Sequence, residues 1–247
     1  MPIWLKDLTG AWVFYTIIPK PKALKAQFKR IARFAPIIGI FIGLFQSLLW
    51  LLLHHLGWPK EAIILFVLCF GYWITGGLHL DGLMDTADGI AAGKVKCLEA
   101  MRDSRVGASG IQAFILIILL QIAALLKVGN IALFILPLAT FWGRVAPLWA
   151  IEKFEYLQKT GTGFFHKENW LGYRKEIQPS FFILFLISIF LLFLPISINQ
   201  LLIIIIFIFS GIFPAILIPH FIGKKLKGHT GDSYGACVVL VETFILF

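Results

Sequence analysis

Three aspartates stand at helical spacing between two apolar stretches of the chain: Asp81, Asp85 and Asp88. At 100° per residue this spacing puts all three carboxylates on one helix face, with rises of roughly 6 Å and roughly 4.5 Å between neighbours. Like charges on one stripe repel each other and need a positive partner. Carboxylate oxygens suit hard cations such as Mg²⁺, which commonly keeps room for phosphate. The stripe therefore predicts a Mg²⁺ site in which neighbouring pairs share an ion, and all three acids would close on one ion only with help from another helix.

The stripe is expected at the C-terminal end of the preceding apolar helix, where the helix dipole disfavours anions. The competing interpretation is a solvated loop that ends at Gly89. Against it, apolar side chains are interleaved with the acids (Leu78, Leu80, Leu83 and Met84). Carboxylates at a membrane helix end are functional by default, which favours metal binding. His79 projects about 160° from the stripe, so we do not expect it to bind the same ion.

A second polar segment, Arg102-Asp103-Ser104-Arg105, places two guanidinium groups around a carboxylate. A guanidinium fork binds phosphate oxygens bidentately, and Asp103 can add a metal ligand. A surface salt-bridge cluster or a lipid-headgroup anchor explains the tetrad equally well when it is taken alone.

A third segment, Gly231-Asp232-Ser233-Tyr234-Gly235, precedes the last apolar stretch. The simpler interpretation is that Asp232 or Ser233 caps the helix that follows. The alternative is that glycines 228 and 231 leave backbone N–H groups free to approach an anion. Glu242, inside the apolar stretch, needs a partner in either case.

Composition indicates what holds these segments. The chain is 59% hydrophobic and 14% charged, whereas a soluble domain is near half apolar and about a quarter charged. The excess falls in apolar blocks, which predicts one all-α domain over residues 1–247, a polytopic integral membrane protein with about seven transmembrane helices. The expected spans lie near 35–53, 61–78, 111–127, 131–150, 180–196, 200–222 and 234–247, with 3–18 as an eighth, interfacial segment.

Basic residues alternate between the connections. With these spans, 19 of the 22 Lys and Arg residues fall on one side, together with all three polar segments. The positive-inside rule makes that side the cytoplasm. The distribution predicts chemistry at the cytoplasmic interface on a substrate with a phosphorylated head. The net charge of +9 is explained by loops beside an anionic lipid bilayer, so nucleic acid is not an expected partner.

The three segments together resemble the cobalamin synthase family, the adenosylcobinamide-GDP ribazoletransferases. The family pattern has Gly-Gly-x-His-Leu-Asp-Gly-Leu-x-Asp-Thr-x-Asp-Gly, then Met-Arg-Asp-Ser-Arg-x-Gly, then Thr-Gly-Asp-Thr-x-Gly-Ala. The chain matches it in order and spacing at residues 76–89, 101–107 and 230–236, with Ser233 for the usual Thr. Residues 14–19 are similar to the family's Phe-x-Thr-Arg-x-Pro, but Ile17 replaces the Arg. Val239 stands where many members have an acid.

The resemblance implies a Mg²⁺-dependent enzyme of the bacterial inner membrane. It would join adenosylcobinamide-GDP to α-ribazole 5′-phosphate (or α-ribazole) and release GMP, with its active site on the cytoplasmic side. These two substrates and the lipid bilayer are the expected partners, and self-association is left open.

The expected site residues come from the matched motifs. Asp81, Asp85 and Asp88 are expected to hold the metal. Asp85, Asp88, Arg102 and Arg105 are expected to be catalytic, with Asp88 favoured as the base for the hydroxyl proton because it is nearest the cytoplasmic end. Substrate contacts are expected from the other polar residues of the motifs: His79, Asp103, Ser104, Gly231, Asp232 and Ser233.

Two other functions compete. A CDP-alcohol phosphotransferase acting on lipid also uses a helix-borne aspartate cluster, but its Asp-Gly-x-x-Ala-Arg and Gly-x-x-x-Asp-x-x-x-Asp arrangement is missing from residues 81–105. A cation transporter with the stripe as its ion site predicts acids near mid-bilayer that are accessible from both sides, whereas these acids are expected at one end.

Overall fold

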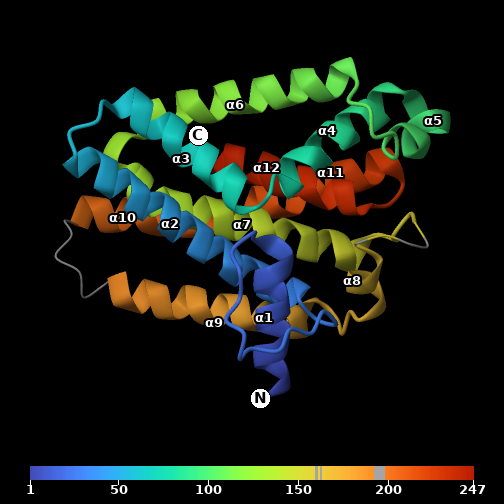
Figure 1. Cartoon of the computed structure of the whole chain (residues 1–247), viewed down its shortest axis with the longest axis horizontal. Coiled ribbons are helices and arrows are strands. Elements are labelled where there is room, and N and C mark those ends of the chain that lie inside the picture. Colours follow the sequence, from blue (N-terminus) through green and yellow to red (C-terminus); the bar gives the residue numbers. More distant parts are fainter. Residues whose placement is uncertain (159–160, 162, 192–197) are drawn as a thin grey trace.

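The computed structural model describes residues 1–158, 161, 163–191 and 198–247, and every regular element in those ranges is helical (Figure 1). The all-α prediction is therefore confirmed. The helices are α1 (Ile3–Tyr15), α2 (Ala35–His55), α3 (Lys60–Ile74), α4 (Leu78–Ala91), α5 (Gly93–Ala100), α6 (Ala108–Val128), α7 (Ala132–Lys153), α8 (Phe164–Glu168), α9 (Tyr173–Leu191), α10 (Ile198–Ser210), α11 (Ile212–Leu226) and α12 (Gly231–Leu246). Short 3₁₀ turns at Ala32–Phe34 and Gly129–Ile131 precede α2 and α7.

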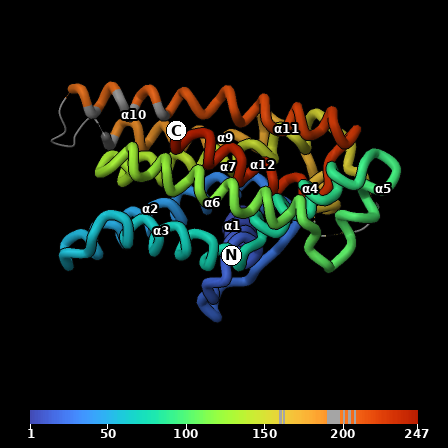
Figure 2. Tube along the Cα trace, turned by 90° about the horizontal axis from the view of Figure 1, so that it is seen from above, coloured from blue at the N-terminus to red at the C-terminus, as the bar shows by residue number. Residues whose placement is uncertain are grey.

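Helix α7 is central and packs against α2, α11 and α12. Figure 2 shows α7 and α12 between the layer of α10 and α11 and the layer of α2 and α3. Glycines let these backbones approach closely, as is common between membrane helices. A Cβ added at Gly39 would lie 2.4 Å from the carbonyl oxygen of Thr140, and one at Gly43 would lie 2.4 Å from Cα of Pro137. Larger residues at either glycine would push α2 away from α7.

The apolar helices are compatible with a membrane protein. In the described part of the chain, Ala32–His55 and the run Ala108–Lys153 are long and apolar enough to cross a bilayer. Helices α3 and α4 qualify only as a pair, and they are bent by 86° at the break between them. Two or three such segments are thus evident, and the count of seven stays a prediction. Part of the expected span 180–196 lies outside the described residues.

The break between α3 and α4 corrects one expectation. The aspartate stripe does not end the preceding apolar helix but forms a separate helix, with Asp81 in its first turn. The cause is a glycine pair: Gly76 and Gly77 adopt φ of 62° and 73°, a left-handed conformation that glycine takes without strain. The N–H of Gly77 donates to the carbonyl of Tyr72 at 3.0 Å, closing the end of α3. The dipole at Asp81 therefore favours an anion, opposite to the expectation.

Helix α1 lies across the long direction of the bundle (Figure 1). Its 13 residues are fewer than the roughly 20 that a transmembrane helix needs, in keeping with the expected interfacial segment. The chain after α1 is tied to the bundle, because the N–H of Ile17 donates to the carbonyl of Ile74 at 2.9 Å. The matched segment 14–19 is thereby brought beside the glycine break that precedes α4.

The two ends of the bundle differ in what they carry. Helix α5, helix α8 and the α11–α12 connection lie at one end, and the α2–α3 connection lies at the other (Figure 1). The three polar segments of the sequence therefore meet at one end of the molecule.

Candidate functional site

The aspartate stripe faces the start of α12. Helices α4 and α12 pack together, and a Cβ added at Gly82 would lie 2.5 Å from the carbonyl oxygen of Asp232. One turn further along α12, a Cβ at Gly235 would lie 3.3 Å from the backbone of His79. These two glycines let the first and third motifs touch. Helix α12 thus brings a fourth acid, Asp232, close to the aspartate stripe, and the metal site stays a prediction.

Four carboxylates share this contact, and their mutual interactions are repulsive. Asp85 lies in the electrostatic field of Asp81, Asp232 and Asp88. Burial raises the pKa of Asp232 above its ordinary value; the Thr230 hydroxyl opposes the shift, and the charge of Asp81 adds to it. Within the described residues, no hydrogen bond or ion pair is made by the side-chain carboxylate of Asp81 or of Asp85. A cation at this contact would relieve the repulsion.

Asp88 differs from the other acids because both carboxylate oxygens are engaged. They accept hydrogen bonds from the backbone N–H groups of Gly107 at 2.7 Å and Gly110 at 2.8 Å. A Cβ at either glycine would lie within 2.5 Å of the carboxylate, so a larger residue at either position would displace the Asp88 side chain. Asp88 thus fastens the loop of the second motif and the start of α6 to the end of α4.

The donor set fits Mg²⁺ in part. Among the described residues, no three His, Cys, Asp or Glu side chains converge on one point. Mg²⁺ is usually held by only one or two carboxylates, and substrate phosphates and water complete its shell. Asp81, Asp85 and Asp232, which face one another across α4 and α12, supply that kind of hard oxygen donor. The expected ligand Asp88 is committed to backbone N–H groups instead.

The second motif lies in the exposed loop after α5. Arg102, Asp103, Ser104 and Arg105 are all exposed. Arg105 forms an ion pair with Asp103 at 2.7 Å, and its hydrogen bonds lower the pKa of Asp103 to about 2. The described contacts contain none between either guanidinium and the acids of α4 or α12. Asp88 holds the loop near the acids, and both arginine side chains are exposed, with Arg105 paired to Asp103 inside the loop.

The third motif caps helix α12 through Thr230 and Ser233, and the side chain of Asp232 is not part of the capping box. Thr230, and not the expected Asp232 or Ser233, is the N-cap of α12, and it forms a capping box with Ser233. That interpretation was wrong by two or three residues because the cap needs an extended residue whose hydroxyl reaches the third helical N–H. Ser233 is fully buried, and its hydroxyl also lies 2.9 Å from His229 Nδ1. The hydrogen bonds of Ser233 stabilise the start of α12, whereas Asp232 lines the neighbouring cavity. Gly231 donates its N–H to the Tyr156 hydroxyl at 3.1 Å.

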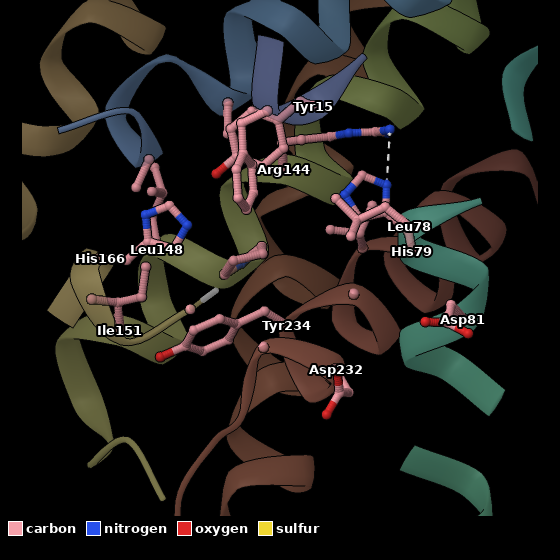
Figure 3. A pocket seen from close by; sticks show the side chains of 18 residues that line it. Tyr15, Leu78, His79, Asp81, Arg144, Leu148, Ile151, His166, Asp232 and Tyr234 are labelled. Atoms are coloured by element: carbon pink, nitrogen blue, oxygen red, sulfur yellow. Dashed lines mark hydrogen bonds between the residues drawn. The ribbon is translucent and has the colours of Figure 1, made fainter. Parts of the chain in front are cut away.

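Next to the acids lies a cavity of about 170 Å³. Figure 3 shows Tyr15, His79, Arg144, His166 and Tyr234 around it, with Asp81 and Asp232 on one side. His79 is buried, stacks on Tyr15 at 6.5 Å between ring centroids, and lies 3.4 Å from Arg144 Nη2. The prediction that His79 points away from the stripe agrees with this position, because it faces the cavity interior.

Sequence reasoning missed most of the cavity. Arg144 on α7 is buried and forms an ion pair with Glu242 of α12, which gives Glu242 the partner that the sequence required. Tyr234 lies inside the third motif, at a position that the family pattern leaves variable, and His166 lies on α8. Neither residue was among the expected site residues. The sequence offered one signal, a charged residue inside an apolar stretch, which drew attention to Glu242 but did not identify Arg144 as its partner.

The match to known proteins extends over nearly the whole chain. A model of the cobalamin-5-phosphate synthase family matches residues 7–247. The adenosylcobinamide-GDP ribazoletransferase of Prochlorococcus marinus strain SARG is 52% identical over 246 residues, 99% of this chain and 95% of the relative. The protein of the same name from Prochlorococcus marinus strain MIT 9303 is 50% identical over 99% of this chain and 95% of its own length. The one from Trichormus variabilis is 37% identical over 98% of this chain and 95% of its own length.

No solved structure matches the chain, so its arrangement of helices rests on the structure described above. The identity along the full length decides the relationship: this chain belongs to the cobalamin-5-phosphate synthase family.

Proposed function

We propose that this chain is an adenosylcobinamide-GDP ribazoletransferase, which joins ribazole to adenosylcobinamide-GDP in the last assembly step of cobalamin biosynthesis. The observation that supports it is the full-length similarity to relatives of that name. The structure adds that all three matched motifs meet at one end of the bundle, on α4, the α5–α6 loop and α12.

The reaction is a phosphoryl transfer. A ribazole hydroxyl oxygen attacks the phosphorus that carries the cobinamide; a new P–O bond forms, the P–O bond to GMP breaks, and the hydroxyl proton leaves to a base. Such reactions depend on positioning and on neutralising the phosphates. Bound Mg²⁺ would supply the neutralising charge, and Asp81 and Asp232 would hold it.

We assign Asp85 as the base that accepts the proton of the attacking ribazole hydroxyl. The carboxylate of Asp88, which the sequence favoured, already accepts two backbone hydrogen bonds. Asp85 is half-buried, its carboxylate has no hydrogen-bond or ion-pair partner among the described residues, and it interacts electrostatically with Asp232 of α12. Arg102 and Arg105 would bind phosphate oxygens from the exposed loop that Asp88 holds in place.

The location is also proposed. The apolar helices would cross the bacterial inner membrane several times, and the end of the bundle with α5 and α8 would face the cytoplasm, because the expected spans put 19 of the 22 basic residues on the same side as the three motifs. Both substrates carry phosphate groups and would reach the site from that side.

The test is metal-dependent GMP release by purified protein in detergent, with adenosylcobinamide-GDP and α-ribazole 5′-phosphate as substrates. We expect activity with Mg²⁺ and none after chelation with EDTA. Asp85→Asn should abolish turnover, whereas Glu99→Gln, which neutralises an exposed acid on α5, should turn over like wild type. A lipid enzyme or a transporter would release no GMP from this substrate pair, and that result would end the proposal.

The same assay tests whether Arg102 and Arg105 bind substrate phosphate or instead anchor the loop to lipid headgroups. Replacing Arg102 or Arg105 by Lys keeps the charge but removes the fork, so turnover should fall by roughly tenfold, equivalent to about 1.4 kcal/mol. The Ala variants should be worse, because losing one donor to a developing charge costs roughly 10²–10³ in rate. If all four variants turn over like wild type, the two arginines do not bind substrate phosphate. Their role is then to contact lipid headgroups, and the phosphate site lies elsewhere.

A further inference from the structure

Three buried polar atoms around the cavity lack a partner in the described structure: Arg144 Nε, His166 Nδ1 and the Tyr234 hydroxyl. All three side chains line the same cavity, and each residue is at most 6% exposed. Buried donors and acceptors are normally satisfied, and an unsatisfied one costs free energy. All three side chains line one cavity, but the unpaired atoms themselves are enclosed by protein, so a ligand with a hydrogen-bonding atom would reach them only after small side-chain rotations.

Much of the remaining lining is aromatic or aliphatic. Phe14 and Tyr15 at the end of α1 approach from one side, with Tyr15 stacked on His79. Leu148 and Ile151 of α7 form the opposite aliphatic wall (Figure 3). Burial lowers the pKa of His166 to about 3, so its ring is neutral at pH 7. Aromatic and aliphatic walls with a few placed polar atoms are the common lining of sites for uncharged rings.

The size of the cavity limits what enters it. At about 170 Å³ it lies below the roughly 300–1,000 Å³ of cavities that enclose a drug-sized molecule. It therefore takes one part of a substrate, such as a ring system, and the rest must extend outside. Asp81 and Asp232 also line the cavity (Figure 3), so a group attached to the buried ring would emerge beside the proposed metal site.

We propose that this cavity binds the heteroaromatic base of ribazole, and this inference rests on the proposed function. Ribazole carries a benzimidazole ring, which is planar, largely apolar and has one ring nitrogen free to accept a hydrogen bond. Arg144 Nε can only donate, and the Tyr234 hydroxyl and His166 Nδ1 can also donate. With the ring inside, the ribosyl hydroxyls lie towards Asp81 and Asp232, where the attack on phosphorus takes place.

The guanine of adenosylcobinamide-GDP suits the cavity less well. Guanine carries the acceptors N7 and O6 on one edge, but on the next edge it presents several N–H donors, each of which would need an acceptor inside the cavity. The carboxylates that line it are Asp81 and Asp232, which lie together on one side (Figure 3) and are assigned to the metal. The nucleotide is better placed outside, near the exposed arginines of the second motif.

The test is a substitution that changes the size of one side chain in the cavity wall. Ile151→Phe narrows the cavity, and Leu133→Phe makes the same change on α7 at a position that does not line it. Equilibrium dialysis would measure the Kd of α-ribazole 5′-phosphate and, separately, of adenosylcobinamide-GDP. A misfit of one methylene in an apolar pocket changes affinity by roughly 10–200-fold. We expect the Kd of α-ribazole 5′-phosphate to rise at least about tenfold in Ile151→Phe alone, with the Kd of adenosylcobinamide-GDP unchanged.

A second variant covers the case in which Ile151→Phe fails to fold. Ile151→Ala widens the same wall and should shift preference towards a ribazole analogue with a larger, tricyclic base, relative to wild type. A weaker Kd for adenosylcobinamide-GDP instead, or equal weakening by Ile151→Phe and Leu133→Phe, would overturn the inference. Because dialysis needs no turnover, an inactive wild-type protein would count against the proposed function while still reporting on the base site.

Discussion

The ion pair of Arg144 and Glu242 is buried between α7 and α12. Arg144 is 3% exposed and also donates to the carbonyl of Thr140 at 3.3 Å. Burying two charges is costly, and their attraction repays that cost only when the geometry and further hydrogen bonds are good. The pair adjoins the cavity through Arg144 and His79, so it sets the position of a cavity wall as well as joining two helices.

Removing one partner should therefore be worse than removing both. Arg144→Met leaves the Glu242 carboxylate without compensation and should lower the free energy of unfolding by roughly 3–5 kcal/mol. Adding Glu242→Met should restore much of that loss, because two apolar side chains of similar volume replace the pair. Thermal unfolding in detergent micelles measures both variants, and a double variant as unstable as the sum of the two single ones would contradict this account.

Some of the site residues were within reach of sequence reasoning and others were not. Asp81, Asp85 and Asp88 are seven residues apart at most, so helical periodicity alone placed them on one face. Arg144 and His79 are 65 residues apart, and nothing local indicates that they meet. The role of Asp88 was also beyond the sequence, because its partners are backbone N–H groups of a loop about twenty residues later.

Helices α4 and α12 meet through glycines, and the separation of the helix axes decides whether the acids face each other. A Cβ at Gly82 would lie 2.5 Å from a carbonyl oxygen and 3.0 Å from Cα of Asp232, so backbone must move. A Cβ at Gly235 meets its nearest atoms only at 3.3–3.4 Å. We expect Gly82→Ala to reduce turnover by roughly 10²-fold, the scale of a 1 Å misplacement at a catalytic site.

Gly235→Ala is the matched control on the facing helix and should keep most of the activity. GMP release and circular dichroism of both variants separate misplacement from unfolding. If Gly235→Ala loses as much activity as Gly82→Ala while both stay helical, the close approach at Gly82 is not what aligns the acids.

At the scale of elements, the sequence predicted where apolar helices lie but not where they break. The expected spans 35–53 and 111–127 correspond to α2 and α6 within a few residues. The expected span 61–78 runs past the end of α3 at Ile74, because the apolar pattern continues through the glycine pair that turns the chain. Periodicity reports which face is buried, whereas a change of direction depends on φ at two glycines.

At the scale of the whole molecule, the polar connections between helices lie at one end of the bundle and the short α2–α3 turn lies at the other. Helices α5 and α8 share one end with the α11–α12 connection, and the α2–α3 connection lies at the other (Figure 1). This arrangement would place every motif within reach of soluble, phosphorylated substrates and leave the opposite end without chemistry. It also makes the orientation testable at exposed positions of both ends.

Cysteine labelling tests that orientation in native membranes. Cys69, Cys97 and Cys237 would first be replaced by Ala, and single cysteines placed at Val95 on α5, Lys225 on α11 and His55 on α2, all of which are exposed. A membrane-impermeant maleimide should label Val95→Cys and Lys225→Cys only in inverted vesicles and His55→Cys only in spheroplasts, because basic residues gather on the cytoplasmic side. Labelling of Val95→Cys from outside would reverse the proposed orientation. Labelling of Val95→Cys and Lys225→Cys from opposite sides would mean that the number of spans between them is odd, and the three motifs could not then face one compartment.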